Sequence, residues 1–326
     1  MSWAEDDWER ATPPVTLPAD EVAELVGFAP LRIQTLAGGK ANTHLRVQGA
    51  DADQVLRIVQ RDAATAEREQ RLWPMVRPHV PVPTVHRWST TRSGLPVAVM
   101  DYVAGETPAD VMARAPEAAH GVGLALGHTL AGLGAVPVAE MGLFAPDLSL
   151  SRRFDTVADS FLDLVDWSLR RGRAGKRLGP AAARVAAAMP RAAEALAVLD
   201  DHPGLAHGDY KSSNLLIRPA ADRWEVAAVL DWEFACPFTP MLDIAILMRH
   251  RDTFPPSFQA GFAAGYGARA WLPDDWRALS RIVDMMNLVG FLNASGDRPR
   301  LYEAVTGQLL ATADAIRRGS PGGAAP

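Results

Sequence analysis

The 326-residue sequence has little cysteine and no block of basic residues. Cys236 is its only cysteine, which excludes a disulfide within the chain. Its 33 lysines and arginines stand against 38 aspartates and glutamates, a formal net charge of -5, which argues against nucleic acid as a partner. The first ten residues are acidic where a signal peptide would be basic and then apolar, so we expect a cytoplasmic protein.

The sequence also lacks a convincing membrane span. Residues 118–139 contain no Asp, Glu, Lys or Arg, but they include His120, His128, five glycines and Pro137. Such residues are unfavourable in a bilayer, so we expect a buried helix of a large lobe and no membrane partner.

The first hundred residues have the texture of a small sheet. After a polar arm over 1–18 and a short helix near 19–26, five β-rich runs follow, separated by turn residues: LRIQTLA, THLRVQG, QVLRIVQ, TVHRWST and PVAVMDYV. One helical segment, which Asp62 is suited to cap, lies between the third and fourth runs. We therefore predict an N-terminal lobe over 1–102, with an antiparallel sheet and one helix.

The rest of the chain is mainly helical. Long Ala- and Leu-rich stretches predict helices over 109–134, 152–170, 180–200, 257–267 and 274–313. Only residues 215–217 and 225–230 indicate strands, joined as a hairpin. The predicted fold is α+β with two lobes, the larger over 103–316, followed by a disordered tail over 317–326.

One motif in the larger lobe carries chemistry. HGDYKSSN places Asp209, Lys211 and Asn214 at offsets 0, +2 and +5, the spacing of the phosphotransferase catalytic loop H-R-D-x-x-x-x-N with Gly208 in place of Arg. Phosphoryl transfer needs metal ions on the phosphates, a cation beside them and an acceptor held in line. Asp209 would orient the acceptor hydroxyl, and Asn214 would offer a neutral oxygen to Mg²⁺.

A second carboxylate is expected where the following hairpin returns. The apolar run AAVL ends abruptly at Asp231, which is placed to be the other metal ligand, and Glu233 is a candidate for contact with metal-bound water or substrate. His207 is expected to brace the loop through ring hydrogen bonds. Each residue alone has an ordinary explanation as a turn, cap or surface charge, but their combination favours a kinase-type site.

The small lobe should supply the cation that holds phosphate. Arg57 lies on the third predicted strand, and two helix carboxylates are candidate partners. Glu69 shares its helix face with the apolar Trp73 at i+4, whereas Glu67 meets Arg71 at i+4 on the other face. We therefore pair Arg57 with Glu69, with a solvated ion pair unrelated to nucleotide as the alternative.

Two further segments are candidates for nucleotide contact. LAGGKAN contains Gly38 and Gly39, which allow the backbone to approach phosphates closely, and it ends in Asn42.

VMDYVAG reads as the link between the lobes. The backbone groups of Asp101 and Val103 are candidates for pairing with adenine, and Met100 for the edge of its pocket.

The sequence resembles the aminoglycoside phosphotransferase and choline kinase-like family over residues 31–310, in the motifs GGKAN, VLRI, EREQRLW, VMDYVAG, HGDYKSSN and VLDWEFACPFTPMLDIA. The resemblance implies a protein-kinase-like fold, MgATP as donor and a small-molecule hydroxyl as acceptor. It implies Asp209 as catalytic base, Asn214 and Asp231 as metal ligands, and Asp243 as a buried brace for the loop.

The sequence departs from the family pattern at three positions. Arg57 replaces the usual Lys, Gly134 stands where many members have His, and Lys211 resembles the catalytic-loop Lys of protein kinases. A protein acceptor is nevertheless disfavoured, because the twelve steps from Asp231 to Asp243 are too few for an activation segment.

The identity of the acceptor stays open at this level. Residues 151–201 hold nine Lys or Arg and seven Asp or Glu, a balance that disfavours a strongly cationic aminoglycoside. The candidates are an antibiotic, either an aminoglycoside or another such as a nucleoside or macrolide, and a metabolic amino alcohol, sugar or hydroxy acid. Asp163 and Asp166 are candidates for meeting one ammonium group. Arg57 also motivates a nucleotide-binding pseudokinase scaffold. The choice between ATP and GTP and between monomer and homodimer is open.

Overall fold

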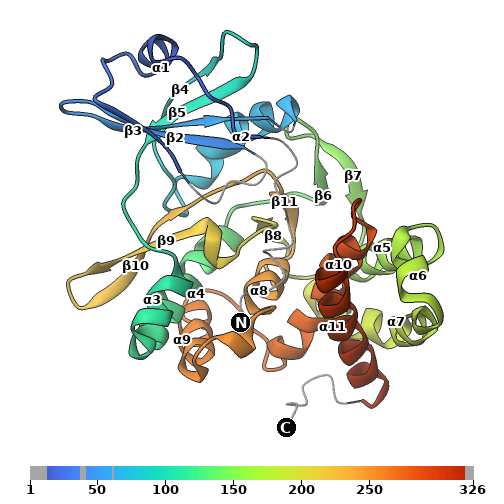
Figure 1. The fold of residues 1–326 in the computed structure, drawn as a ribbon. Coiled ribbons are helices and arrows are strands. Elements are labelled where there is room, and N and C mark those ends of the chain that lie inside the picture. Colours follow the sequence, from blue (N-terminus) through green and yellow to red (C-terminus); the bar gives the residue numbers. More distant parts are fainter. Residues whose placement is uncertain (1–12, 37–41, 61, 320–326) are drawn as a thin grey trace.

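The computed structural model describes residues 13–36, 42–60 and 62–319, which form two lobes (Figure 1). The N-terminal lobe holds a five-stranded antiparallel sheet in the order β1-β2-β3-β5-β4. Its elements are α1 (Ala19–Val26), β1 (Arg32–Thr35), β2 (Thr43–Gln48), β3 (Asp53–Ile58), α2 (Ala63–Val76), β4 (Val85–Thr90) and β5 (Pro96–Asp101). The predicted α+β, two-lobed, kinase-like fold is confirmed.

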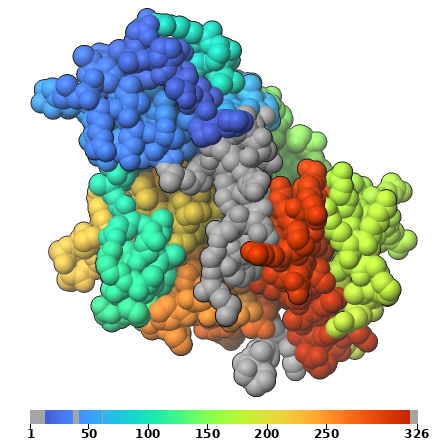
Figure 2. All heavy atoms as spheres, in the orientation of Figure 1, coloured from blue at the N-terminus to red at the C-terminus, as the bar shows by residue number. Residues whose placement is uncertain are grey.

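The C-terminal lobe combines nine described helices with three two-stranded sheets. The helices are α3 (Pro108–Arg114), α4 (Ala119–Gly134), α5 (Val157–Arg170), α6 (Arg173–Leu178), α7 (Ala182–Leu196), α8 (Met241–Met248), α9 (Pro256–Gly267), α10 (Trp276–Asn293) and α11 (Pro299–Arg317). The strands pair as β6 (Met141–Phe144) with β7 (Leu150–Phe154), β8 (Gly204–Ala206) with β11 (Cys236–Phe238), and β9 (Leu215–Ala220) with β10 (Arg223–Val229). In Figure 2, α10 and α11 in red lie beside α5 to α7 in yellow-green.

The two faces of the N-terminal sheet have different neighbours. Because side chains alternate along a strand, Leu56 and Ile58 of β3 pack with α1 in a small core, while Val55 joins the main core that includes α2. Arg57 has the same parity as Val55, so its side chain faces α2 and the C-terminal lobe. The alternation of side chains along β3 therefore places Arg57 at the interface between the lobes.

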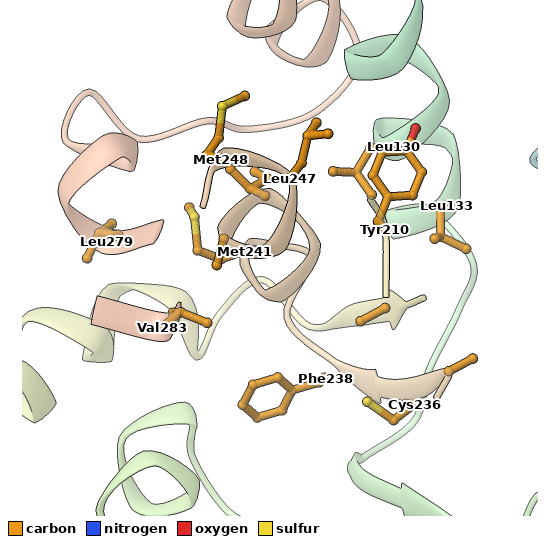
Figure 3. Close-up of a cluster of buried hydrophobic side chains, with 14 of the residues drawn as sticks. Leu130, Leu133, Tyr210, Cys236, Phe238, Met241, Leu247, Met248, Leu279 and Val283 are labelled. Atoms are coloured by element: carbon orange, nitrogen blue, oxygen red, sulfur yellow. The ribbon is translucent and has the colours of Figure 1, made fainter. Parts of the chain in front are cut away.

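Helix α8 passes through the middle of the C-terminal core. Seven of its eight residues are buried, which is typical of a helix that is apolar on all sides. Figure 3 shows side chains of α4, α10 and β11 gathered around it, with Tyr210 among them.

Helices α4 and α9 pack backbone against backbone. A Cβ added to Gly123 or Gly127 would overlap a backbone carbonyl of α9, and one added to Gly261 or Gly265 would overlap a carbonyl of α4. The uncharged run over 118–139 therefore contains a buried helix, as predicted. None of the helices in the described part of the chain combines the length and the apolar character needed to cross a membrane.

The structure corrects several predicted elements of the larger lobe. Strands β6, β7, β8 and β11 were not expected, and α5 begins only at Val157 because residues 150–154 form β7. The single helix expected over 274–313 is two helices, interrupted near Gly296, whose φ is +93°. Helices α6 and α8 were also not expected.

The proposed lobe boundary at 102/103 stays a prediction. Residues 1–12 of the polar arm and 320–326 of the tail lie outside the described residues, whereas 317–319 continue or directly follow α11.

Candidate active site

The backbone of the HGDYKSSN loop is anchored to α8. Asp243, in the first turn of α8, accepts hydrogen bonds from the backbone N–H groups of His207 (2.6 Å) and Gly208 (2.9 Å). Burial raises the pKa of Asp243 to about 7, against the lowering effect of these two bonds. Gly208 has a φ of +77°, and a Cβ there would overlap the carbonyl oxygen of Phe234. Only glycine fits the loop at this position.

His207 connects the loop to the end of strand β10. Its Nδ1 accepts from the backbone N–H of Asp209 (3.2 Å), which leaves Nε2–H to donate to the carbonyl of Leu230 at 2.9 Å. The ring is fully buried, and burial lowers its pKa to about 4, so it is neutral at pH 7. These two hydrogen bonds connect the catalytic loop to the end of β10, and the bracing role of His207 stays a prediction.

The carboxylate of Asp209 lies between an amide and an ammonium. Asn214 Nδ2 donates to Asp209 Oδ2 (2.8 Å) and to its carbonyl oxygen (2.9 Å), and Lys211 Nζ is 3.1 Å from the same Oδ2. Burial raises the pKa of Asp209, and Lys211 acts in the opposite direction. The offsets 0, +2 and +5 therefore bring three side chains into direct contact.

The hairpin returns Asp231 to the level of Asn214. The backbone N–H of Leu230 donates to the carbonyl of Asn214 at 2.8 Å, so the residue after Leu230 emerges beside the loop. Asp231 has a φ of +66°, a left-handed conformation that is costly for a residue other than glycine. Such strain is concentrated at functional sites.

Arg57 contacts both lobes. Its Nη1 pairs with Glu69 in the buried interior, and its Nη2 is 2.9 Å from Asp231 Oδ1. Burial opposes the charge on Arg57, but Glu69 and Asp231 outweigh it and hold its pKa above the ordinary value. Glu67 instead pairs with exposed Arg71 at 3.3 Å. The structure thus separates the two glutamates as the helix-face argument predicts.

Asn42 is buried at the end of the nucleotide-contact segment. Its Oδ1 accepts from the backbone N–H of Gln60 at 3.2 Å, which ties it to the end of β3. Gly38 and Gly39 lie outside the described residues.

The predicted adenine contacts are placed at the end of β5. Met100 is buried in the main core, and Val103 is half-buried. The N–H of Asp101 donates to the carbonyl of Thr84 at 2.9 Å, and its side chain lies 2.7 Å from His86. The backbone N–H of Asp101, which was a candidate for pairing with adenine, is therefore already hydrogen-bonded within the protein.

The candidate substrate carboxylates differ in exposure. Asp163 and Asp166 lie on the exposed side of α5, where they pair with Arg152 (3.1 Å) and Arg170 (2.5 Å). Glu233 is buried, and its backbone carbonyl accepts from Arg68 at 2.5 Å.

Sequence reasoning missed two supports of the loop. Trp232 is fully buried and its ring packs edge-on against His207, with centroids 4.7 Å apart. Ser212 Oγ accepts from the backbone N–H of Ala109 at 2.8 Å, which connects the loop to α3. The sequence signal for Trp232 was an aromatic residue between two carboxylates in DWE. The contact of Ser212 with Ala109 has no sequence signal, because the two residues are 103 positions apart.

The oxygen donors at this site fit Mg²⁺. Because Nδ2 of Asn214 is used by Asp209, its Oδ1 is the atom left for a metal, and Asp231 follows Leu230, whose backbone N–H donates to the Asn214 carbonyl. Carbonyl and carboxylate oxygens completed by water and phosphate are the usual Mg²⁺ environment. No group of three or more His, Cys, Asp or Glu able to hold a metal ion was found within the described residues.

The profile of the phosphotransferase enzyme family matches residues 32–280, which is more than half of the chain. The chain belongs to the phosphotransferase enzyme family. It is thus an enzyme of the class to which the catalytic-loop motif points, and the resemblance noted in the sequence is confirmed. A search of curated proteins gives no significant match.

Solved phosphotransferase structures share the fold. A thermostable mutant of aminoglycoside phosphotransferase APH(4)-Ia, in complex with AMP-PNP and hygromycin B, has a TM-score of 0.70 and 17% identity, covering 94% of this chain and 100% of its own. The GDP complex of a mutant aminoglycoside 2'-phosphotransferase-IIIa gives 0.67 and 18%, covering 93% and 98%. A putative aminoglycoside phosphotransferase from Ralstonia eutropha gives 0.63 and 17%, covering 92% and 98%. At these identities the likeness establishes the fold.

Proposed function

We propose that this phosphotransferase moves the γ-phosphoryl group of ATP, bound with Mg²⁺, to a hydroxyl group of a small molecule. The observation that carries the proposal is the contact of Asp209 with Lys211 and Asn214 at the point where β10 delivers Asp231. This set supplies an acceptor-orienting carboxylate, a cation and two metal ligands. Complexes of one structural neighbour with AMP-PNP and with ADP support an adenine nucleotide as donor, whereas a second neighbour is a GDP complex.

In the proposed mechanism Asp209 accepts a hydrogen bond from the acceptor hydroxyl and aims its oxygen at the γ-phosphorus. A new O–P bond forms as the bond from phosphorus to the β,γ-bridging oxygen breaks, and the hydroxyl proton passes to an Asp209 oxygen. Lys211 offsets the charge of the moving phosphoryl group. Mg²⁺, when held by Asn214 and Asp231, would neutralise charge on the β- and γ-phosphates.

Arg57 is proposed to bind phosphate oxygens from the N-terminal lobe. A guanidinium forks, so Arg57 is able to keep its contact with Glu69 while the other nitrogen turns from Asp231 to a phosphate. Asn42 and the Gly38–Gly39 turn are proposed for the phosphates, and Met100, Asp101 and Val103 for the adenine end.

The acceptor is proposed to be an antibiotic, because structural neighbours include aminoglycoside phosphotransferases. A metabolic alcohol is the second candidate. The buried single Cys236 is consistent with a reducing compartment, and we keep the cytoplasm as the proposed location.

A pseudokinase scaffold is the alternative of another class. The ion pair between Arg57 and Asp231 favours it. In this pair Arg57 binds a carboxylate where phosphate is expected, and Asp231 binds a guanidinium where a metal ion is expected.

One experiment separates the two functions. ADP release is measured with Mg²⁺ and a panel of hydroxylated small molecules, for the wild type and for Asp209→Asn, while nucleotide binding is followed by calorimetry. Turnover that rises with an acceptor and falls by about 10³-fold in the variant supports the enzyme. Nucleotide binding without any turnover above the variant supports the scaffold.

A further inference from the structure

A cavity of about 170 Å³ adjoins the catalytic loop at Lys211, Ser212 and Ser213. It is bounded by the start of α3, the loop itself, the end of α8 and the turn that follows α8. Lys211 lines the cavity and also contacts Asp209, so a hydroxyl group at the loop end of the cavity would be close to the catalytic carboxylate. One lining side chain of the cavity is therefore in contact with the proposed catalytic carboxylate.

The lining of this cavity is poor in negative charge. None of the described lining residues is Asp or Glu. Four are apolar, namely Ala109, Ile246, Leu247 and Phe254, and three carry hydroxyl groups, namely Ser212, Ser213 and Thr253. The other two described lining residues are Lys211 and His250. Burial, helped by Arg249 and Lys211, lowers the pKa of His250 to about 3, which makes this ring neutral at pH 7. Lys211 is thus the only charged side chain among these lining residues.

Two carboxylates of the surrounding fold have cationic partners. Asp209 pairs with Lys211, and Asp284 of α10 is buried against Arg249, whose Nε is 3.1 Å from its Oδ1. Asp110 and Asp252 are exposed beside the lining residues Ala109 and Thr253, and Asp252 is 4.0 Å from Arg251. An ammonium group that reached Asp209 or Asp284 would have to displace the cation already paired with it. Separating a buried pair is costly, because the remaining charge is left without a partner.

The volume of the cavity limits the group that enters it. A cavity of about 150 Å³ is large enough for benzene. A single ring or a branched aliphatic group therefore fits inside, and any further part of the acceptor would lie outside, because the cavity is open to solvent.

From this volume and lining we infer that the part of the acceptor that enters the cavity is a compact apolar group that carries the hydroxyl and no positive charge, neutral or anionic. The inference rests on the proposed phosphoryl transfer and specifies its acceptor. Apolar contact with Leu247 and Phe254 would hold this group, and the hydroxyl group would point past Lys211 towards Asp209. A lining without a carboxylate disfavours a polycationic aminosugar as the preferred acceptor.

A charge-matched panel tests the inference. It consists of 4-methylbenzyl alcohol, 4-(hydroxymethyl)benzoate and 4-(aminomethyl)benzyl alcohol, with chloramphenicol as a larger neutral probe and hygromycin B as a polycation. Phosphorylated product is followed by mass spectrometry with MgATP. We expect kcat/KM for a neutral or anionic member to exceed that for both cationic members by at least about tenfold, a factor that corresponds to about 1.4 kcal/mol.

The inference is overturned if a cationic member is used as well or better. It is also overturned if no neutral or anionic member is accepted while the wild type still hydrolyses ATP to water faster than Asp209→Asn. Failure of the proposed function itself looks different: ATP does not bind, or its hydrolysis is the same in wild type and Asp209→Asn.

A carboxylate placed in the cavity tests its location. Thr253 lies at the exposed rim, in the turn after α8. In Thr253→Glu the ratio of kcat/KM for the anionic member to that for the ammonium member should fall by about tenfold. Thr253→Gln separates the effect of charge from that of size, and Leu31→Glu puts the same charge on the exposed N-terminal lobe. An unchanged ratio in Thr253→Glu means that the acceptor binds elsewhere.

Discussion

Arg57 and Asp231 are 174 positions apart in the sequence, and their side chains form a 2.9 Å ion pair between the two lobes. The expected phosphate-binding cation and an expected metal ligand therefore neutralise each other. Bound MgATP would give each a new partner, phosphate for Arg57 and metal for Asp231. The ion pair keeps both charges in the site at a lower electrostatic cost than two isolated charges would have.

Replacing Arg57 tests its role on phosphate. Arg57→Ala should lower kcat/KM for ATP by about 10²-fold, because one preorganised charge is lost. Glu69 is left buried without its partner, so the free energy of unfolding should fall by about 3 kcal/mol. Steady-state ADP release is compared with Arg71→Ala, which removes an exposed arginine near the same helix face as Glu67. Wild-type kinetics in Arg57→Ala would contradict phosphate binding.

Lys211 is expected to act on the moving phosphoryl group. Lys211→Ala should lower kcat by about 10²-fold, because its charge matters most in the transition state, while the Kd for ATP changes little. Rapid-quench kinetics and calorimetry measure the two quantities. Lys176→Ala, on α6, is the control. An equal loss in ATP affinity and kcat would instead assign Lys211 to ground-state nucleotide binding.

Gly208 tests the geometry of the catalytic loop. Gly208→Ala puts a Cβ against the carbonyl of Phe234 at a φ of +77°, so both strain and overlap oppose it. Gly94→Ala has a φ of +89° but no neighbour within 4 Å, so only strain acts. We expect a loss of about 1 kcal/mol for Gly94→Ala and at least about twice that for Gly208→Ala, measured by urea unfolding. Equal losses would show that the overlap is relieved by a small shift.

Gly127 tests the close packing of α4 on α9. A Cβ there would overlap the carbonyl of Phe262, and backbone does not move aside cheaply. Gly127→Ala should therefore destabilise the protein by about 2 kcal/mol despite the better helix propensity of Ala. Gly290→Ala, on α10 with open space around it, should stabilise by about 0.5 to 1 kcal/mol. Thermal unfolding measures the stability of both variants. Stabilisation of both would contradict the close backbone contact between α4 and α9.

The neutral ring of His207 predicts acid sensitivity. Its pKa of about 4 in the folded protein lies below the ordinary value of 6.5, so its contribution is complete above pH 6.5 and is lost as the pH falls through 4. The loss is about 3 kcal/mol at its limit. His207→Asn cannot titrate and should flatten the fall in unfolding free energy between pH 6.5 and 4. His120→Asn, at an exposed site, is the control. His250 contributes with the same sign, so the variants are compared with each other.

The features that the sequence predicted well depend on local spacing. The order of the β-rich runs placed Arg57 on the third strand, and helix periodicity chose Glu69 over Glu67. The short hairpin between Asn214 and Asp231 left little freedom in where Asp231 returns. The functional roles of these residues stay predictions.

The features that were missed depend on contacts distant in sequence. Strand β8 has three residues and pairs with β11 some thirty residues later, so neither carries a period of its own. Strand β7 contains Arg152 and Arg153 and is largely exposed, which hides the alternation that marks a strand. The break before α11 follows from Gly296 and Pro299, whose separate turn signals were outweighed by the surrounding helical composition.

Helix α8 positions both the catalytic loop and one wall of the cavity. Asp243 in its first turn sets the position of the catalytic loop, while Ile246 and Leu247 line the cavity about one turn further on. At 1.5 Å per residue, these residues lie about 4.5 to 6 Å from Asp243 along the axis of a buried helix. Substitutions in its last turn would thus change which molecules are accepted without moving the base, so acceptor choice is able to diverge among descendants of this chain while the chemistry persists.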